Sequence, residues 1–557
     1  MFKKSLTTLY NSALLFILTF ANLLIITVCL YLIKISITVF NMPIAFILSI
    51  VELYFIKKDK IKNIAISSVI TIIVFLISII ISGNIYDKSF DGNAYHKEAI
   101  GLLKNGWNPT YGSLEDFGEK TDLSTIHYLF IEPYPKATWI YGANVYKLTN
   151  NIETAKSFNL IFLFVAITIV IYLINKYSKQ KKLSLIMGLA VGCFPIIWQQ
   201  ILSLYVDGFM GYILLLTIIY MYLLTKENNN KEYFFIIGSL LIILINIKYT
   251  GLMYAGIFCL GYYIYYFVIK IKNKEYNHLL KFTLKFVTIV LVGVLFVGSN
   301  SYVKNIFDYK NLLYPLIGED KIDIMTDLEP SSFENKSAIK KSIISLFSYT
   351  ANIGRFNNQV PYFKIPFTIN KYELDQISED TRIGGFGVWF SGIFIISIIV
   401  IGIFFLINLK NKNYNLLIML GIPTIIILGF MATISDGWWA RYSPQIFFIS
   451  LIALYLLLKD NKKIINLMGY ALMSLIIINT LLCGFNLYKG LIVSKNAIVV
   501  RNEIKNKKIY IEPANKFLTG LYYNFEDLNC EYTVVPYGTL KDKKYFINDI
   551  VGYEIIE

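Results

Sequence analysis

Apolar runs, each about as long as a membrane-spanning helix, recur along the chain and are separated by short polar segments. Because a helix needs about 20 apolar residues to cross a bilayer, this pattern predicts an all-α protein that spans the membrane many times. The hydropathy pattern predicts about thirteen transmembrane helices. They lie near 11–33, 37–56, 64–83, 157–175, 183–199, 206–225, 233–247, 251–269, 286–300, 387–408, 415–433, 444–458 and 464–487.

The composition supports a membrane protein and excludes several other classes. Hydrophobic residues make up 56% of the 557 residues and charged residues only 16%, against about 25% charged residues in a soluble domain. The net charge is +15, but the lysines lie in short connections rather than in one patch, so we expect no nucleic-acid partner. There is no nucleotide-binding motif. The five cysteines form no C-x-x-C pair, so neither a zinc site nor a disulfide framework is expected.

The positions of the lysines predict the orientation of the chain. Lysine clusters fall on alternate connections, near 57–62, 176–182, 226–231, 270–274, 410–412 and 459–463. By the positive-inside rule these connections and the N-terminus are cytoplasmic. The C-terminus is then extracytoplasmic, and so are the long polar segments 84–156 and 301–386.

The chain divides into a membrane domain, 1–487, and a small C-terminal domain, 488–557. The C-terminal segment holds four β-type runs (KKIYIEP, CEYTVVPY, KKYFIND and VGYEIIE). Their alternating apolar positions predict strands, so we expect a small α/β domain outside the membrane.

Candidate catalytic acids follow the third apolar run, in YDKSFDGNAYHKEAIGLLKNGWNPTY. Helical spacing from 91 to 104 predicts an amphipathic helix on the membrane surface, with Asp91, Tyr95 and Glu98 on one face. Asp87 lies four residues before Asp91, and His96 follows Tyr95. Ser89 or Asp91 is the expected N-cap of this helix. A second helix is predicted near 134–148.

Other candidates lie in short connections on the same predicted side of the membrane. Asp207 begins an apolar helix in SLYVDG, and Lys248 lies in NIKYTG. Arg441, in GWWARYSPQ, is one of only four arginines, and its planar fork matches a phosphate. Each has an ordinary alternative: a helix cap, a snorkelling lysine or part of an interfacial aromatic belt. Further binding candidates are Trp107, Arg382, Trp438, Trp439 and Tyr442.

Taken in order, the stretches DGNAYH, GWNPTY, YVDG, NIKYTG, YVKNIFDYKNLLYP, RIGGFG and ARYSPQ resemble those of GT-C superfamily membrane glycosyltransferases. This superfamily comprises polytopic glycosyltransferases that use lipid-phosphate-linked sugars, including protein O-mannosyltransferases and the aminoarabinose transferase of lipid A. The stretches look like those of its bacterial members from cell-surface polysaccharide loci. The resemblance covers about 80–450, and its motifs are short. It differs from the family pattern because the acidic loop follows the third span rather than the first.

The resemblance implies transfer of a sugar from a polyprenyl-phosphate donor to a glycan, lipid or protein acceptor outside the cell. Asp91 or Asp87 is then the general base, and Asp207 orients the acceptor or a cation. Lys248 and Arg441 stabilise the leaving phosphate, while the aromatic residues shape the sugar pocket. No paired D-x-D is present at Asp207, which favours a reaction without a metal, although Mg²⁺ or Mn²⁺ remains an alternative.

Other functions stay open at this stage. A flippase or transporter of lipid-linked sugars is expected to carry ionisable groups near the middle of the bilayer. A polysaccharide polymerase uses related donors. A scaffold of a cell-wall assembly complex does not need these acids.

Overall fold

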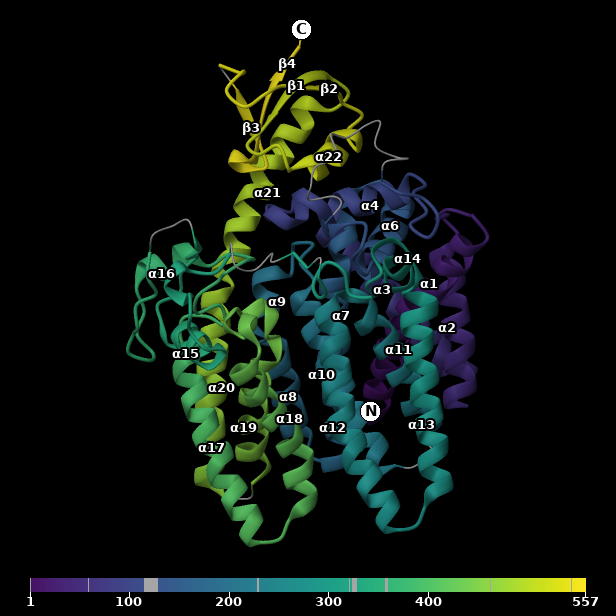
Figure 1. Cartoon of the computed structure of the whole chain (residues 1–557), viewed down its shortest axis with the longest axis vertical. Helices are drawn as coiled ribbons and strands as arrows, with labels where there is room; N and C mark the ends of the chain where they lie inside the picture. The colour runs from purple at the N-terminus through teal and green to yellow at the C-terminus, as the bar shows by residue number, and fades with distance from the viewer. Residues whose placement is uncertain are drawn as a thin grey trace.

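Long helices stand side by side in the computed structural model, and a small sheet lies beyond one end of the helix bundle (Figure 1). The structure describes residues 2–58, 60–114, 129–227, 230–319, 321–322, 328–355, 359–460, 462–541 and 543–556. We call the end of the bundle next to the sheet the sheet-side end. Parts of the two long polar segments, 115–128 and 323–327 among them, lie outside the described residues.

The first three helices show how burial varies among apolar segments. They are α1 (Phe2–Leu32), α2 (Asn41–Lys57) and α3 (Ile61–Gly83). Helix α1 is packed within the bundle, with 72% of its most apolar window buried, whereas only 22% of the corresponding window in α3 is buried. Exposed apolar residues along α3, such as Ile72 and Ile80, match a face that contacts lipid.

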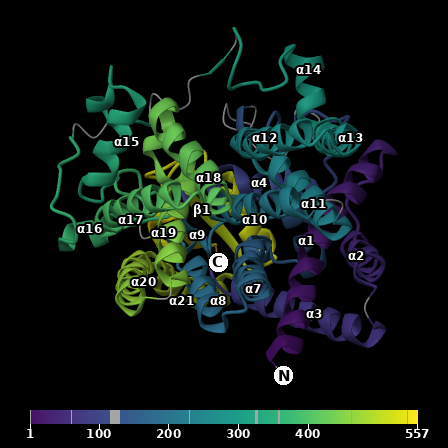
Figure 2. The ribbon, with the colours of Figure 1, turned by 90° about the horizontal axis from the view of Figure 1, so that it is seen from below.

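The remaining long helices complete the bundle. They are α7 (Phe158–Ser178), α10 (Asp207–Lys226), α11 (Lys231–Ile247), α12 (Tyr249–Lys272), α13 (Tyr276–Leu291), α17 (Phe390–Lys410), α18 (Tyr414–Thr433), α20 (Lys463–Cys483) and α21 (Phe485–Ile504). Shorter helices are α8 (Lys181–Gly192), α9 (Pro195–Gln200) and α19 (Phe448–Lys459). Seen along the bundle, α1–α3 and α17–α20 lie on opposite sides, with α7, α8 and α10 between them (Figure 2).

The prediction of a helical membrane protein is confirmed, but the count of thirteen spans is wrong. Within the described residues, nine helices are long and apolar enough to cross a membrane. The expected spans near 37–56, 183–199, 233–247 and 444–458 fall on helices that are too short. One reason is proline: Pro195 begins the short helix α9 and so interrupts the expected span near 183–199. In the expected span near 444–458, the first turn is a separate tight helix, Pro444–Phe447, and α19 begins only at Phe448.

The first predicted amphipathic helix is present, but it is buried rather than spread on a surface. A wide helical turn at Gly92–His96 leads into α4 (Lys97–Lys104). The Ser89 hydroxyl accepts a hydrogen bond from Gly92 N at 3.2 Å and caps the turn. Helix α4 packs against α6 (Ala137–Thr149), which confirms the second predicted helix.

The C-terminal sheet confirms the four strands predicted from the alternating pattern. The strands are β1 (Lys508–Pro513), β2 (Glu531–Val534), β3 (Lys544–Phe546) and β4 (Val551–Ile555). Their order is β2-β1-β4-β3, with β1 parallel to β2 and antiparallel to β4. The predicted domain boundary at 487/488 falls within α21, which leads from the bundle into the sheet (Figure 1).

The second long polar segment, 301–386, combines short helices with turns. Its described residues include the short α-helices α14 (Lys304–Tyr309), α15 (Ala338–Phe347) and α16 (Lys371–Gln376). The chain between α16 and α17 runs back over the sheet-side end and brings Asp380 and Arg382 there.

Candidate functional site

Arg441 lies at the centre of a charged cluster at the sheet-side end. It sits in a short helical turn between α18 and α19 and is 7% exposed. Its Nε donates to Asp207 Oδ2 at 3.0 Å and its Nη2 to Asp91 Oδ2 at 3.0 Å. Its Nη1 donates to Asp380 Oδ1. One guanidinium therefore joins three carboxylates from three separate segments.

Lys248 adds a second cation to the same cluster. Its Nζ lies 3.1 Å from Asp207 Oδ1, so the two oxygens of Asp207 bind two different cations. Asp207 is the first residue of α10 and Lys248 is the residue before α12. We call Arg441, Asp91, Asp207, Asp380 and Lys248 the Arg441 cluster.

Asp207 is held in place by a neighbouring glutamine. Gln200 Nε2 donates to Asp207 Oδ2 at 3.2 Å, and Gln200 Oε1 accepts from Gly208 N at 3.0 Å. The Asp207 side chain has no exposed surface. A buried carboxylate with three donors is fixed in position, and it restrains the two cations that bind its oxygens, Arg441 and Lys248.

Asp91 and Asp380 are the accessible acids of the cluster. The Asp91 side chain is 19% exposed, and its Oδ2 also accepts from the Tyr95 hydroxyl at 3.1 Å. The Asp380 side chain is 32% exposed. Burial of its carboxyl group, with the Asp91 charge beside it, outweighs Arg441 and raises the pKa of Asp380 to about 6.

Aromatic rings surround the cations. The Arg441 guanidinium lies 4.3 Å from the centre of the Tyr205 ring and 5.3 Å from that of Trp439. Lys248 Nζ lies 4.1 Å from the centre of the Tyr442 ring. These distances suit cation–π contacts. They also give the cluster flat apolar walls beside its charges.

His96 is a neutral neighbour of the cluster. Burial lowers its pKa to about 4. Trp139 Nε1 donates to His96 Nδ1 at 2.7 Å, and because an indole nitrogen can only donate, the histidine proton is on Nε2. Arg382 lies at the edge, with Nε 3.8 Å from Asp380 Oδ2 and its guanidinium 5.3 Å from the Trp439 ring centre.

Asp87 lies in a different environment from Asp91. It is 1% exposed, and its two oxygens accept from Ser89 N at 2.8 Å and Leu204 N at 2.7 Å. Burial raises its pKa. A Cβ at Gly92 would lie 2.2 Å from Asp87 Oδ2, so the close fit requires glycine there.

Three other predicted residues do not join the Arg441 cluster. Glu98 is fully buried beside Thr519 and Tyr523 of the C-terminal region, and burial raises its pKa to about 7. The Trp107 indole donates to Gly112 O at 3.2 Å, away from the cluster. Trp438 stacks on Trp439 but packs edge-on against Phe333 on its other side.

Glu98 turns away because the Gly92–His96 turn is wide. Lys97 N bonds to Gly92 O, five residues earlier rather than four. The extra residue in this turn rotates everything after it relative to an ideal helix. Asp91 and Tyr95 still meet, but Glu98 leaves their face and points to the C-terminal region.

Asp380, Gln200 and Tyr205 were missed by the sequence analysis. Asp380 had a local signal, since it lies two residues before Arg382 in SEDTRIGG. Gln200 is the last residue of α9 and Tyr205 lies in the turn before α10; both are neutral, and nothing in the sequence marks them.

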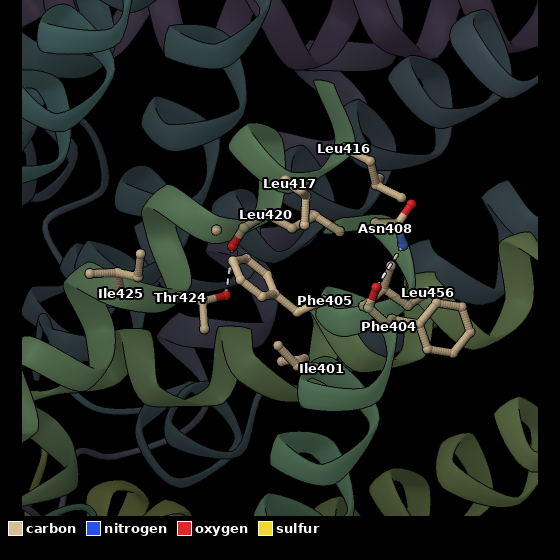
Figure 3. Close-up of a pocket in the computed structure, with 11 residues that line it drawn as sticks. Ile401, Phe404, Phe405, Asn408, Leu416, Leu417, Leu420, Thr424, Ile425 and Leu456 are labelled. Carbon is tan, nitrogen blue, oxygen red and sulfur yellow. Dashed lines mark hydrogen bonds between the residues drawn. The ribbon is translucent and has the colours of Figure 1, made fainter. Parts of the chain in front are cut away.

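A small cavity and a larger groove lie away from the cluster. A cavity of about 50 Å³ between α17 and α18 is lined mainly by apolar side chains. Its polar residues are Asn408, whose Nδ2 donates to Phe404 O at 2.7 Å, and Thr424, whose hydroxyl donates to Leu420 O at 2.6 Å (Figure 3). It holds no ionisable group. A groove of about 450 Å³ lies between α7, α10, α18 and α19.

No family model matches this sequence, and no curated protein matches it. Among the described residues, no group of three or more His, Cys, Asp or Glu side chains is arranged to hold a metal ion.

Proposed function

We propose that the protein is a membrane glycosyltransferase that moves a sugar from a polyprenyl-phosphate donor to an acceptor hydroxyl. The observation that carries this proposal is the Arg441 cluster itself. A partly exposed carboxylate, Asp91, lies next to two cations that a buried carboxylate, Asp207, holds together. A base beside a fixed pair of cations suits the attack of a hydroxyl group with loss of a phosphate.

Asp91 acts as the general base. It removes the proton from the acceptor hydroxyl, whose oxygen forms a bond to the anomeric carbon. The bond from that carbon to the phosphate oxygen breaks, with inversion, and the polyprenyl phosphate leaves as an anion. Asp91 suits this role better than Asp87 because an acceptor can reach it, whereas Asp87 is sealed.

Arg441 and Lys248 stabilise the leaving phosphate. Arg441 Nη1 donates to Asp380 Oδ1, and a donor phosphate needs the same donor for one of its oxygens. We propose that the phosphate displaces Asp380. A proton on Asp380 helps this step, since its pKa of about 6 makes the proton available near neutral pH. Protonated Asp380 has no negative charge, so it no longer competes with the donor phosphate for Arg441.

The lipid part of the donor fits the surroundings of the site. Asp207 begins an apolar span, so a phosphate at the cluster leaves its prenyl chain alongside the bundle. Tyr442 is partly exposed and offers a ring face that the sugar can reach, whereas Tyr205 and Trp439 are buried and pack against Arg441. Charges at the end of a span, rather than near its middle, favour an enzyme over a transporter.

The test is transfer by the purified full chain in detergent. Polyprenyl monophosphate and diphosphate sugars are offered with glycan, lipid and peptide acceptors, and products are identified by mass spectrometry. We expect transfer from a monophosphate donor. Transfer only from a diphosphate donor would indicate a polymerase instead. No transfer with any donor and acceptor, by a folded protein, would overturn the proposal.

A further inference from the structure

The groove of about 450 Å³ is apolar along most of its length and has lysines at one end. Its walls are apolar, with Leu215 and Ile219 of α10 facing Phe448 and Ile452 of α19. Its polar end carries Lys226 and Lys459, the last residues of α10 and α19. Helix α10 begins in the Arg441 cluster, and its 20 residues span about 30 Å. The polar end of the groove therefore lies at the end of the bundle opposite the cluster.

The two lysines contact neutral groups. Lys226 Nζ donates to Asn415 Oδ1 at 2.8 Å and to the Tyr265 hydroxyl at 3.3 Å. Lys459 Nζ lies 5.4 Å from the Tyr455 ring centre. Within the described part of the chain, neither ammonium group is in ion-pair distance of a carboxylate. Both charges are available to an anion at the mouth of the groove.

We infer that this groove binds an anionic phospholipid, with one acyl chain between α10 and α19 and its phosphate against Lys226 and Lys459. The volume lies within the range of about 300–1,000 Å³ that is typical of ligand sites. A polar solute does not suit walls that are apolar along their length. A neutral lipid would gain no attraction from the positive charges of the two lysines. The inference is independent of the proposed transfer reaction, since the groove and the Arg441 cluster share no residue.

The headgroup, not the tail, must give this site its selectivity. An acyl chain that moves from the bilayer into an apolar groove leaves one hydrocarbon environment for another, so it gains little. A lysine near the membrane surface attracts an anionic lipid by about 1 kcal/mol. Two lysines then correspond to an affinity difference of about thirtyfold. Selectivity for negative charge is thus the property to measure.

Native mass spectrometry of the full chain in detergent measures this selectivity. Phosphatidylglycerol, phosphatidylcholine and inorganic phosphate are titrated separately. We expect phosphatidylglycerol to bind about thirtyfold more tightly than phosphatidylcholine, and free phosphate not to bind. Equal binding of the two lipids would overturn the inference, and so would binding of phosphate alone.

Two variants and a matched control locate the site. The double substitution Lys226→Gln with Lys459→Gln should bring phosphatidylglycerol down to the level of phosphatidylcholine. Ile219→Trp should fill the groove and reduce binding of both lipids. The control changes two exposed lysines outside the groove, Lys231→Gln with Lys272→Gln, and should retain the preference. An equal loss in the control would show general surface attraction and overturn the inference.

Discussion

Two groups of charged side chains lie near each other at the sheet-side end, and they differ in how far they are closed to solvent. In the first, the Arg441 cluster, Asp91 is 19% and Asp380 32% exposed. The second is centred on Glu153, whose Oε1 accepts from Lys97 Nζ at 2.6 Å and Asn524 Nδ2 at 2.9 Å. Its other oxygen binds Lys156 Nζ and, at 3.0 Å, Asp87 N.

The second group, the Glu153 network of Glu153, Lys97, Lys156, Asn524 and Asp87, supports the fold. Its lysines are fully buried and Glu153 is 1% exposed, so no ligand reaches them. It ties the C-terminal region to the bundle through Asn524. Through Asp87 it also holds Leu204, three residues before Asp207. Asp87 and Asp91, only four residues apart, thus differ in their access to solvent: Asp87 is sealed and Asp91 is open.

The largest expected effect is on catalysis, from Asp91→Asn. Loss of a general base lowers the transfer rate by about 10²–10⁴, while the fold should be retained because Asp91 is partly exposed. Initial rates in the transfer assay measure this, and thermal unfolding in detergent checks the fold. Asp308→Asn removes an exposed acid from α14 and is the control. Near wild-type transfer by a folded Asp91→Asn variant would remove Asp91 as the base.

The next effect is on stability, from Glu153→Gln. The change leaves Lys97 and Lys156 buried without a carboxylate, and breaking such a pair costs about 3–5 kcal/mol. Denaturant unfolding of the detergent-solubilised chain measures the loss. The control is Glu531→Gln, which breaks an exposed pair with Lys508 that is 2.7 Å long, and an exposed pair contributes about 0–1 kcal/mol. Equal losses in the two variants would contradict the contrast in burial.

Much of this contrast could not be read from the sequence. Asp87 and Asp91 both follow an apolar run and both precede a helix, so local pattern does not separate them. What separates them is the Leu204 amide, more than a hundred residues away, which binds Asp87. Burial of this kind depends on tertiary packing, and no local sequence pattern indicates it.

The members of the Arg441 cluster could be predicted from the sequence better than the difference in burial between Asp87 and Asp91. Asp207, Lys248 and Arg441 are rare charges at the ends of apolar runs, and the alternation of lysine clusters assigned them to one side. The structure brings these three and Asp91 together. The predicted strands were similarly clear because their period is local. Asp380 was missed because the segment around it has no regular period that would show where it folds back.

A smaller effect on stability is expected from Asp87→Asn. The amide retains one acceptor oxygen, but its nitrogen cannot accept from either Ser89 N or Leu204 N. One buried amide is then left unsatisfied, at a cost of about 1–3 kcal/mol. Denaturant unfolding should show this loss, and the folded variant should transfer sugar at close to the wild-type rate. A folded Asp87→Asn variant that loses transfer as completely as Asp91→Asn would show that the two acids act together in the reaction.

The smallest effect is on the pH dependence of donor binding, and it concerns Asp380. Its ionised form competes with the donor phosphate for Arg441, so the donor binds better below the pKa of about 6 and worse above it. Between pH 5 and pH 7 the ionised form becomes dominant, and the KM for donor should rise about tenfold. Asp380→Asn removes the competing charge, so its KM should be low at pH 7 and nearly constant over this range. The matched comparison is Asp375→Asn, which changes an acid in the neighbouring helix α16 and should keep the wild-type profile. A fall in kcat without a change in the KM profile would instead make Asp380 a second proton acceptor, and the open cluster would then contain two working acids rather than one acid and a displaceable one.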